Sequence, residues 1–195
     1  MLTRQRIYNK AAQQTFQTYM TQPMKRLAEV LLIFTALFFT GCDDDSQYSI
    51  YRVNYVFDKS ISPFIQVNSY GQFICVRQGT KAGQYLLTDA KGNTQTVVLS
   101  EYQMQTDPFY YGLGGLIIGT PMNCDGNIWA YDWACPTCDN QRHRVGIDYT
   151  IGHAKCPNCA TVFDLNSGGI AIEGKSRPLW HYRVFVNEPN VIIKN

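Results

Sequence analysis

Residues 134–159 read ACPTCDNQRHRVGIDYTIGHAKCPNC and contain two Cys-Pro-x-Cys motifs, with 17 residues between the inner cysteines. A Cys-x-x-Cys loop presents two sulfurs on one side of a tight turn, and proline after the first cysteine restricts that turn. Two such loops facing each other supply four thiolates in a tetrahedron, which suits zinc or a single iron ion. The pattern therefore predicts one metal centre held by Cys135, Cys138, Cys156 and Cys159.

Two other uses of these cysteines stay open. Two disulfides would suit a protein exported to an oxidising compartment, although bridges that close small loops gain little loop entropy. The segment WACPTC, residues 133–138, is superficially similar to a thioredoxin active site. However, the residues after Cys138 lack the apolar spacing of the helix that lowers a thiol pKa in such a site.

The N-terminal region has the pattern of an export signal. Residues 24–42, MKRLAEVLLIFTALFFTGC, have a basic start and a mostly apolar stretch from Leu27 to Phe39, and they end in Thr-Gly-Cys. This stretch is short for a membrane span and is typical of a secretory signal. A cysteine directly after small residues resembles a lipoprotein signal, which predicts a lipid on Cys42 and cleavage before it. The alternative is an uncleaved anchor helix, and Met24 is a candidate for the true start.

These features divide the chain into a leader (residues 1–41), an acidic tether (42–49) and a β domain (50–195) with metal-binding loops at 133–165. Five of the 17 basic and one of the 15 acidic residues precede Cys42, so the mature part carries net charge −2. Its basic residues are scattered, which argues against nucleic acid as a partner. The run Asp43–Asp45 resembles an export signal to the outer face of the outer membrane. We therefore expect a lipoprotein of the cell envelope, in the outer membrane, on its periplasmic or surface face.

The mature sequence favours an all-β fold. Segments rich in Val, Ile, Tyr and Phe alternate with Gly, Asn, Asp and Pro at short intervals, which is typical of an antiparallel sandwich or barrel. Hairpin turns are expected at residues 91–93, 125–126 and 167–169. Sustained helical periodicity is confined to the leader. The expected strands are YRVNYVF, FIQVNSYGQFICVRQ, QYLLTDAKGNTQTVVLS, GGLIIGTPM, NIWAYDW, TVFDLNSGGIAIEG and RPLWHYRVFV.

The motifs and their flanks resemble the Rieske ferredoxin-like domain. DGNIWAYDWACPTC (residues 125–138) is similar to the family's strand and first loop, and KCPNCATVFDLNSGGIAIEGKSRPLWHYRV (155–184) to its second loop and exit. The resemblance covers about residues 105–187. It implies a Rieske-like sandwich or barrel, here with a metal-binding subdomain similar to rubredoxin or a zinc ribbon.

The ligands depart from that family, which uses two cysteines and two histidines. Cys135 and Cys156 fall on the family's cysteines, Cys159 takes the place of the second histidine, and Thr137 stands where the first is expected. Three centres remain open: a structural zinc ion, which we favour, a [2Fe-2S] cluster, or a single iron. The leader has Lys25-Arg26 and no Arg-Arg pair, which argues against export of a folded cluster protein.

Other residues have two interpretations each. His143, His153 and His181 are either surface residues or donors near the sulfurs. Cys75 and Cys124 are free thiols or a disulfide pair. Trp129, Tyr131 and Trp133 alternate along one strand and form either packing or an exposed platform.

No catalytic constellation is visible, and a four-sulfur site leaves no open position for substrate. We expect a non-enzymatic binding or scaffold module with structural zinc, anchored to the membrane by its lipid and acting with an unknown envelope protein. The alternative is an electron carrier with a [2Fe-2S] cluster or rubredoxin-type iron in the same site.

Overall fold

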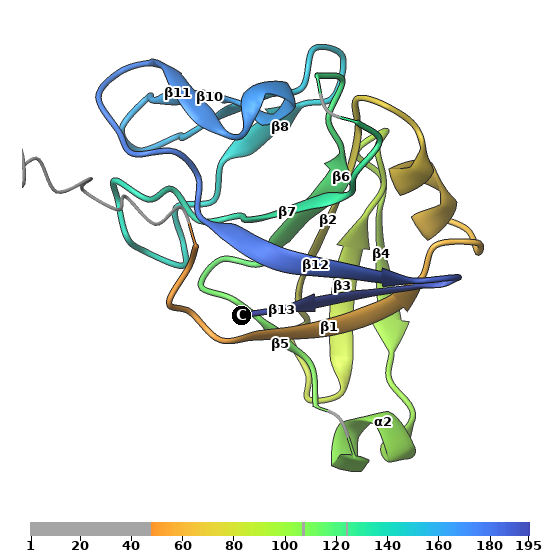
Figure 1. Ribbon diagram of the computed structural model, residues 1–195. Coiled ribbons are helices and arrows are strands. Elements are labelled where there is room, and N and C mark those ends of the chain that lie inside the picture. The colour runs from red at the N-terminus through yellow and green to blue at the C-terminus, as the bar shows by residue number, and fades with distance from the viewer. Residues whose placement is uncertain (1–47, 107, 124) are drawn as a thin grey trace, which may run out of the picture. The chain divides into compact units, whose positions relative to one another are not determined.

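Figure 1 shows a computed structural model of the protein, which describes residues 48–106, 108–123 and 125–195. The chain divides into two compact units, residues 1–45 and 46–195, and every described residue belongs to the second. The expected leader, the predicted lipidation site Cys42 and most of the expected tether therefore lie outside the described residues, as does Cys124. Within the described part, no helix is both long and apolar enough to cross a membrane.

The expected all-β, antiparallel fold is confirmed. A nine-stranded sheet has the order β4-β3-β2-β6-β7-β12-β13-β1-β5, and a four-stranded sheet has the order β11-β10-β9-β8. The large sheet consists of β1 (Val53–Asp58), β2 (Gln72–Gln78), β3 (Gln84–Thr88), β4 (Thr94–Val98), β5 (Tyr110–Tyr111), β6 (Leu116–Thr120), β7 (Trp129–Asp132), β12 (His181–Asn187) and β13 (Asn190–Lys194). The small sheet consists of β8 (Gly146–Asp148), β9 (His153–Lys155), β10 (Val162–Asp164) and β11 (Ile170–Glu173).

The turns show how local sequence sets the strand pairs. β3 and β4 pair directly around Asp89, whose carboxylate accepts hydrogen bonds from the N–H groups of Lys91 (2.9 Å) and Asn93 (2.8 Å). The expected turn at 167–169 joins β10 to β11, and Gly168 and Gly169 both have positive φ angles. Asp125 and Gly126 lie in a longer connection between the paired strands β6 and β7.

Among the described residues, three short helical segments interrupt the strands. The expected strand FIQVNSYGQFICVRQ begins instead as a 3-10 helix, η1 (Phe64–Asn68), and continues as β2. Ser100 and Gln103 exchange hydrogen bonds at the start of α2 (Glu101–Thr106), with Ser100 Oγ accepting from Gln103 N at 3.3 Å. The third segment is η2 (Leu165–Ser167). Each is too short to produce the periodicity by which a helix is recognised.

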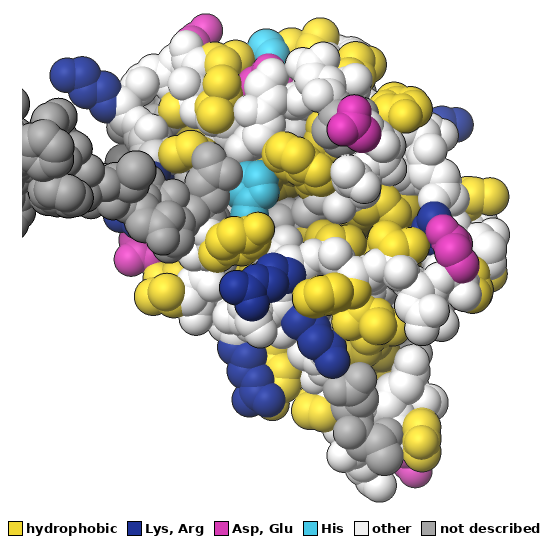
Figure 2. Space-filling view, viewed as in Figure 1, with side chains coloured by type: hydrophobic (Ala, Val, Ile, Leu, Met, Phe, Trp, Pro, Cys, Tyr) yellow, Lys and Arg dark blue, Asp and Glu magenta, His cyan; other side chains and the backbone are white. Residues whose placement is uncertain are grey.

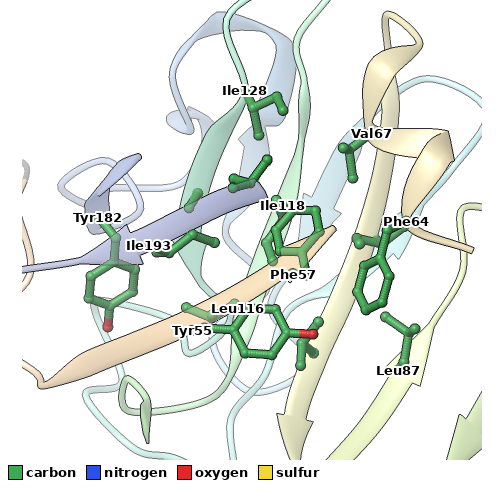
Figure 3. Packing of buried hydrophobic residues seen from close by; sticks show 14 of the residues in the cluster. Tyr55, Phe57, Phe64, Val67, Leu87, Leu116, Ile118, Ile128, Tyr182 and Ile193 are labelled. Carbon is green, nitrogen blue, oxygen red and sulfur yellow. The ribbon is translucent and has the colours of Figure 1, made fainter. Parts of the chain in front are cut away.

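Two hydrophobic clusters lie on opposite faces of the central strands. In β6, Leu116 and Ile118 belong to the first cluster, and Ile117 points to the second. The first cluster lies inside the large sheet, where Tyr55, Phe57, Leu116, Ile118 and Ile193 converge (Figure 3). The second contains Phe163 and Leu165 as well as Cys135 and Cys156. β6 is therefore buried along its whole length, because the small sheet and the cysteine loops cover the face that a single sheet would leave to solvent.

Candidate metal centre

The two Cys-Pro-x-Cys loops converge. The Sγ atoms of Cys135, Cys138, Cys156 and Cys159 all lie within 4.8 Å of one another, and among the described residues these four alone form such a group. The Sγ atoms of Cys135 and Cys159 are 3.5 Å apart, and those of Cys138 and Cys156 are 3.7 Å apart. A disulfide would bring two sulfurs to about 2.05 Å, and all four residues are free cysteines. The four cysteines are therefore close enough to hold a metal ion.

The backbone of the two loops follows the same pattern. In the first, the N–H of Asp139 donates to the carbonyl of Cys135 at 3.0 Å; in the second, the N–H of Ala160 donates to Cys156 at 3.0 Å. Asp139 and Ala160 both have positive φ angles, 44° and 59°. Each loop is thus a tight turn, and the residue directly after its second cysteine has a left-handed backbone conformation. This geometry leaves both sulfurs of a pair on the side of the turn that faces the other loop.

Neighbouring strands fix where each loop begins. The first follows β7, and the N–H of Cys135 donates to the carbonyl of His143 at 2.9 Å. The second lies between β9 and β10, and the N–H of Cys156 donates to the carbonyl of Thr161 at 2.9 Å. Because β9 and β10 are paired along their length, the second loop closes a short hairpin of the small sheet.

A buried carboxylate connects the first loop to the large sheet. Asp132, at the end of β7, is fully buried, and its Oδ1 accepts hydrogen bonds from the N–H groups of Gly114 (2.9 Å) and Ala134 (2.7 Å). Its Oδ2 accepts from the N–H of Leu113 (2.7 Å) and the hydroxyl of Tyr182 (2.5 Å). Burial raises the pKa of Asp132, and these donors oppose that shift. Since Ala134 directly precedes Cys135, the carboxylate fixes the backbone that leads into the site.

Close packing reinforces this connection. A Cβ on Gly114 would overlap the backbone nitrogen of Ala134, so only glycine allows the two segments to approach so closely. The indole of Trp133 donates to the carbonyl of Val145 at 2.7 Å, and the hydroxyl of Tyr131 donates to the carbonyl of Leu165 at 2.8 Å. The cysteine loops are therefore held by hydrogen bonds and packing on several sides.

The sulfurs differ in environment. Cys135 and Cys156 are buried, whereas Cys138 and Cys159 are partly exposed. Burial raises the pKa of Cys135. Burial also opposes ionisation of Cys159, but hydrogen bonds with Thr161 and with the sulfurs of Cys156 and Cys135 outweigh it and lower the pKa of Cys159 to about 6. The side-chain amide of Asn158 donates to Sγ of Cys138 at 3.3 Å. Such hydrogen bonds to sulfur stabilise the thiolate form, which is the form that binds metals.

The other residues singled out in the sequence lie apart from the sulfurs. None of His143, His153 and His181 joins the group of ligand atoms. The ring of His181 packs against Tyr131 with ring centroids 4.6 Å apart, and its Nε2 lies 3.0 Å from the carbonyl oxygen of Gly168. Cys75 is a buried free thiol 3.8 Å from the hydroxyl of Tyr149.

The three aromatic residues of the strand before the first loop do not form one exposed platform. Tyr131 is fully buried in the second cluster, and Trp129 and Trp133 are partly buried against it. Sequence reasoning also missed Asp132 and Tyr182. The available signal was an acidic residue inside an aromatic strand three positions before a cysteine, which suggests a buried and therefore hydrogen-bonded carboxylate.

Comparison with models of known protein families gives no match, and comparison with curated proteins gives none either. The geometry of the four cysteines and their supports therefore carries the functional argument.

Proposed function

We propose that this protein is an exported, lipid-anchored envelope protein whose domain binds one zinc ion through Cys135, Cys138, Cys156 and Cys159. The ion has a structural role in a non-enzymatic binding or scaffold module. The observation that carries this proposal is the spacing of the four sulfurs, all within 4.8 Å of one another. Four sulfurs about 2.3 Å from a central zinc ion lie about 3.8 Å from each other, close to the separations of 3.5 and 3.7 Å.

The same spacing counts against a two-iron cluster. Such a cluster has two irons, each held by its own pair of ligands, so the sulfurs separate into two distinct pairs. Here all four sulfurs lie within 4.8 Å of one another, so they do not separate into two distant pairs. This arrangement fits a single central ion better than two.

A structural role agrees with the position of the site. The small sheet has strands of only three or four residues. Strands this short bury little apolar surface of their own. A bound zinc ion supplies coordination bonds without redox chemistry, and its binding free energy becomes folding free energy. The second cysteine loop, between β9 and β10, would therefore be stabilised by the same ion that holds the first loop to β7.

The envelope location is supported by the sequence of residues 24–45. The secretory pattern ends in a cysteine after small residues, and an acidic run follows it. We propose that Cys42 carries the lipid and that residues 43–47 link it to the β domain. We also propose that residues 105–187 form a Rieske-like domain in which Cys159 takes the place of the second histidine and Cys138, one residue after Thr137, supplies the remaining ligand.

Metal analysis with an absorbance spectrum, on full-length protein purified without added metals, tests the zinc site. We expect one equivalent of zinc, no visible absorption, and loss of the zinc in Cys138→Ser. Cys75→Ala is the matched control, because it removes a buried cysteine outside the group and should keep the zinc. A coloured protein that can be reduced reversibly would instead establish the electron-transfer alternative.

One observation favours that alternative with a single iron. Cys138 and Cys159 are partly exposed, which gives an electron a short path from the centre to a partner. The spectrum of the purified protein separates the two candidates, because a ferric ion in four thiolates is coloured and zinc is colourless.

A further inference from the structure

The outward face of β12, β13 and β1 carries a row of basic residues. Arg183 on β12 is exposed next to the buried Tyr182, and burial alternates along β13 up to the exposed Lys194, so both side chains point outward. The two are direct cross-strand partners, and Asn54 of β1 is the next residue in the row. Tyr110 of β5 lies opposite Asn54, and the guanidinium of Arg52 lies 3.8 Å from the centre of its ring. We call Arg52, Arg183 and Lys194 the basic row.

The basic row has no acidic partner within the described structure. Like charges directly opposite each other in a sheet are destabilising. The ion pair found among the described residues does not relieve this repulsion, because it joins Lys59 to Glu188. Asp58, the acidic residue of β1, lies opposite Asn190 at the far end of the strands. Figure 2 shows Lys and Arg side chains gathered over β12, β13 and β1 on this face. The row is therefore complementary to an anionic surface.

Exposed aromatic side chains accompany the basic row. Phe185, two residues after Arg183 on the same side of β12, is 53% exposed, and Tyr48 is 54% exposed. The guanidinium of Arg183 lies 5.4 Å from the centre of the Tyr48 ring. Aromatic rings beside Lys and Arg side chains suit the boundary between lipid headgroups and hydrocarbon, where an apolar body and a polar end are both satisfied.

The start of the described chain places this face close to the predicted anchor. Tyr48 is six residues after Cys42, and six residues span at most about 20 Å. Tyr48 is held on the domain by a bridge to His181, in which the N–H of Ser49 donates to the His181 carbonyl at 2.9 Å. If the lipid is on Cys42, the face that carries Tyr48 and Arg183 lies within that distance of the bilayer.

We propose that the basic row, with Tyr48 and Phe185, docks on the anionic headgroups of the leaflet that holds the lipid anchor. This inference rests on the proposed anchor and is independent of the metal. Each Lys or Arg near an anionic bilayer contributes about 1 kcal/mol, or roughly fivefold in binding. The contact would fix the orientation of the domain on the membrane rather than leave it to turn freely on its tether.

Photo-crosslinking of the full-length lipoprotein tests this proposal. Benzoylphenylalanine replaces Phe185, and in a control protein it replaces Thr96, which is exposed on β4 and paired with the outward residue Leu86. The proteins are reconstituted in vesicles of phosphatidylcholine, with or without phosphatidylglycerol. We expect lipid adducts at position 185 when phosphatidylglycerol is present, fewer at high salt, and few at position 96.

Charge removal makes the test quantitative. Arg183→Gln and Lys194→Gln should each weaken docking about fivefold and lower the adduct yield at position 185 by up to that factor, while bound metal is unchanged. Equal yields at positions 185 and 96, no dependence on phosphatidylglycerol, or adducts to protein rather than lipid would each overturn the proposal. So would adducts that appear only after Asp43–Asp45 are replaced by serine, because the acidic run would then cover the row.

The intact mass of the protein in the same samples shows whether Cys42 carries a lipid. It therefore separates failure of the anchor from failure of docking. A protein without lipid at Cys42 overturns both. A lipidated protein without adducts at position 185 overturns docking alone, and leaves the anchor and the metal site as proposed.

Discussion

Replacing Asp132 with asparagine should destabilise the protein strongly while leaving its shape almost unchanged. The carboxylate is fully buried and accepts hydrogen bonds from three backbone N–H groups and the hydroxyl of Tyr182. Asparagine has one acceptor oxygen in place of two. Its amide N–H₂ must therefore face either Gly114 and Ala134 on one side or Leu113 and Tyr182 on the other.

The second orientation costs less, because a tyrosine hydroxyl can rotate and accept a hydrogen bond. It still leaves the N–H of Leu113 unpaired, at about 1–3 kcal/mol for a buried donor. The remaining hydrogen bonds also lose their charge assistance, which roughly halves the strength of each. Relief from burying a charge offsets part of this loss. We therefore expect Asp132→Asn to lower the free energy of unfolding by about 3 kcal/mol.

Tyr182→Phe removes one of the four donors and leaves the carboxylate paired with the other three. Its expected cost is about 1.5 kcal/mol, so the asparagine variant should be the less stable of the two. Asp148→Asn is the matched control. Asp148 accepts from Thr150 in an exposed turn at 2.9 Å, so its replacement should cost far less than that of Asp132.

Urea unfolding followed by tryptophan fluorescence measures these differences, with all proteins saturated with the same metal because a ligand of the native state raises apparent stability. The double variant should be less destabilised than the sum of the single variants, since both remove the Asp132–Tyr182 hydrogen bond. A loss below about 0.5 kcal/mol in Asp132→Asn would refute this account, because it would show that the four donors do not need the carboxylate.

Three further predictions concern the surroundings of the four cysteines. Gly114→Ala should destabilise the protein by about 3 kcal/mol in the same unfolding assay, because its Cβ would overlap the backbone of Ala134, whereas Gly146→Ala meets its nearest atom at 3.8 Å and should be tolerated. Ala160→Gly should stabilise the protein by about 1 kcal/mol, since alanine is strained at φ 59°; a loss of stability would contradict the left-handed turn. Removal of the metal with a chelator should raise hydrogen exchange in β8–β11 well before β1 and β13, and simultaneous exchange in both sheets would contradict a local role for the ion.

The four cysteines could be found from the sequence because each pair is local. A Cys-x-x-Cys loop fixes its two sulfurs within one turn, so only the meeting of two loops depends on the fold. The turn at Asp89 was predictable for the same reason, since its side chain bonds only to the residues that follow it. Turns and loops whose contacts all lie within about five residues of one another can therefore be predicted from a single sequence.

The support of the site could not be predicted because its parts are distant in sequence. Asp132 accepts hydrogen bonds from Leu113 and Gly114, which lie in the connection between β5 and β6, and from Tyr182, which lies on β12, 50 residues later in the chain. Before the fold is known, nothing distinguishes Asp132 from an exposed acidic residue. η1 was missed for a different reason: five residues rich in Phe, Ile and Val read as a strand, and tertiary packing of Phe64 and Val67 overrides that preference.

The first few described residues connect the cysteine loops to the basic row. The hydroxyl of Tyr51 donates to Oδ1 of Asp139, directly after Cys138, at 2.5 Å, and this bond raises the pKa of Tyr51 to about 12. Three residues earlier, Tyr48 lies beneath the guanidinium of Arg183. One short segment thus touches the first cysteine loop at one end and the basic row at the other. If the basic row lies on the membrane, residues 48–51 tie the first cysteine loop to the docked face through the contacts of Tyr51 and Tyr48.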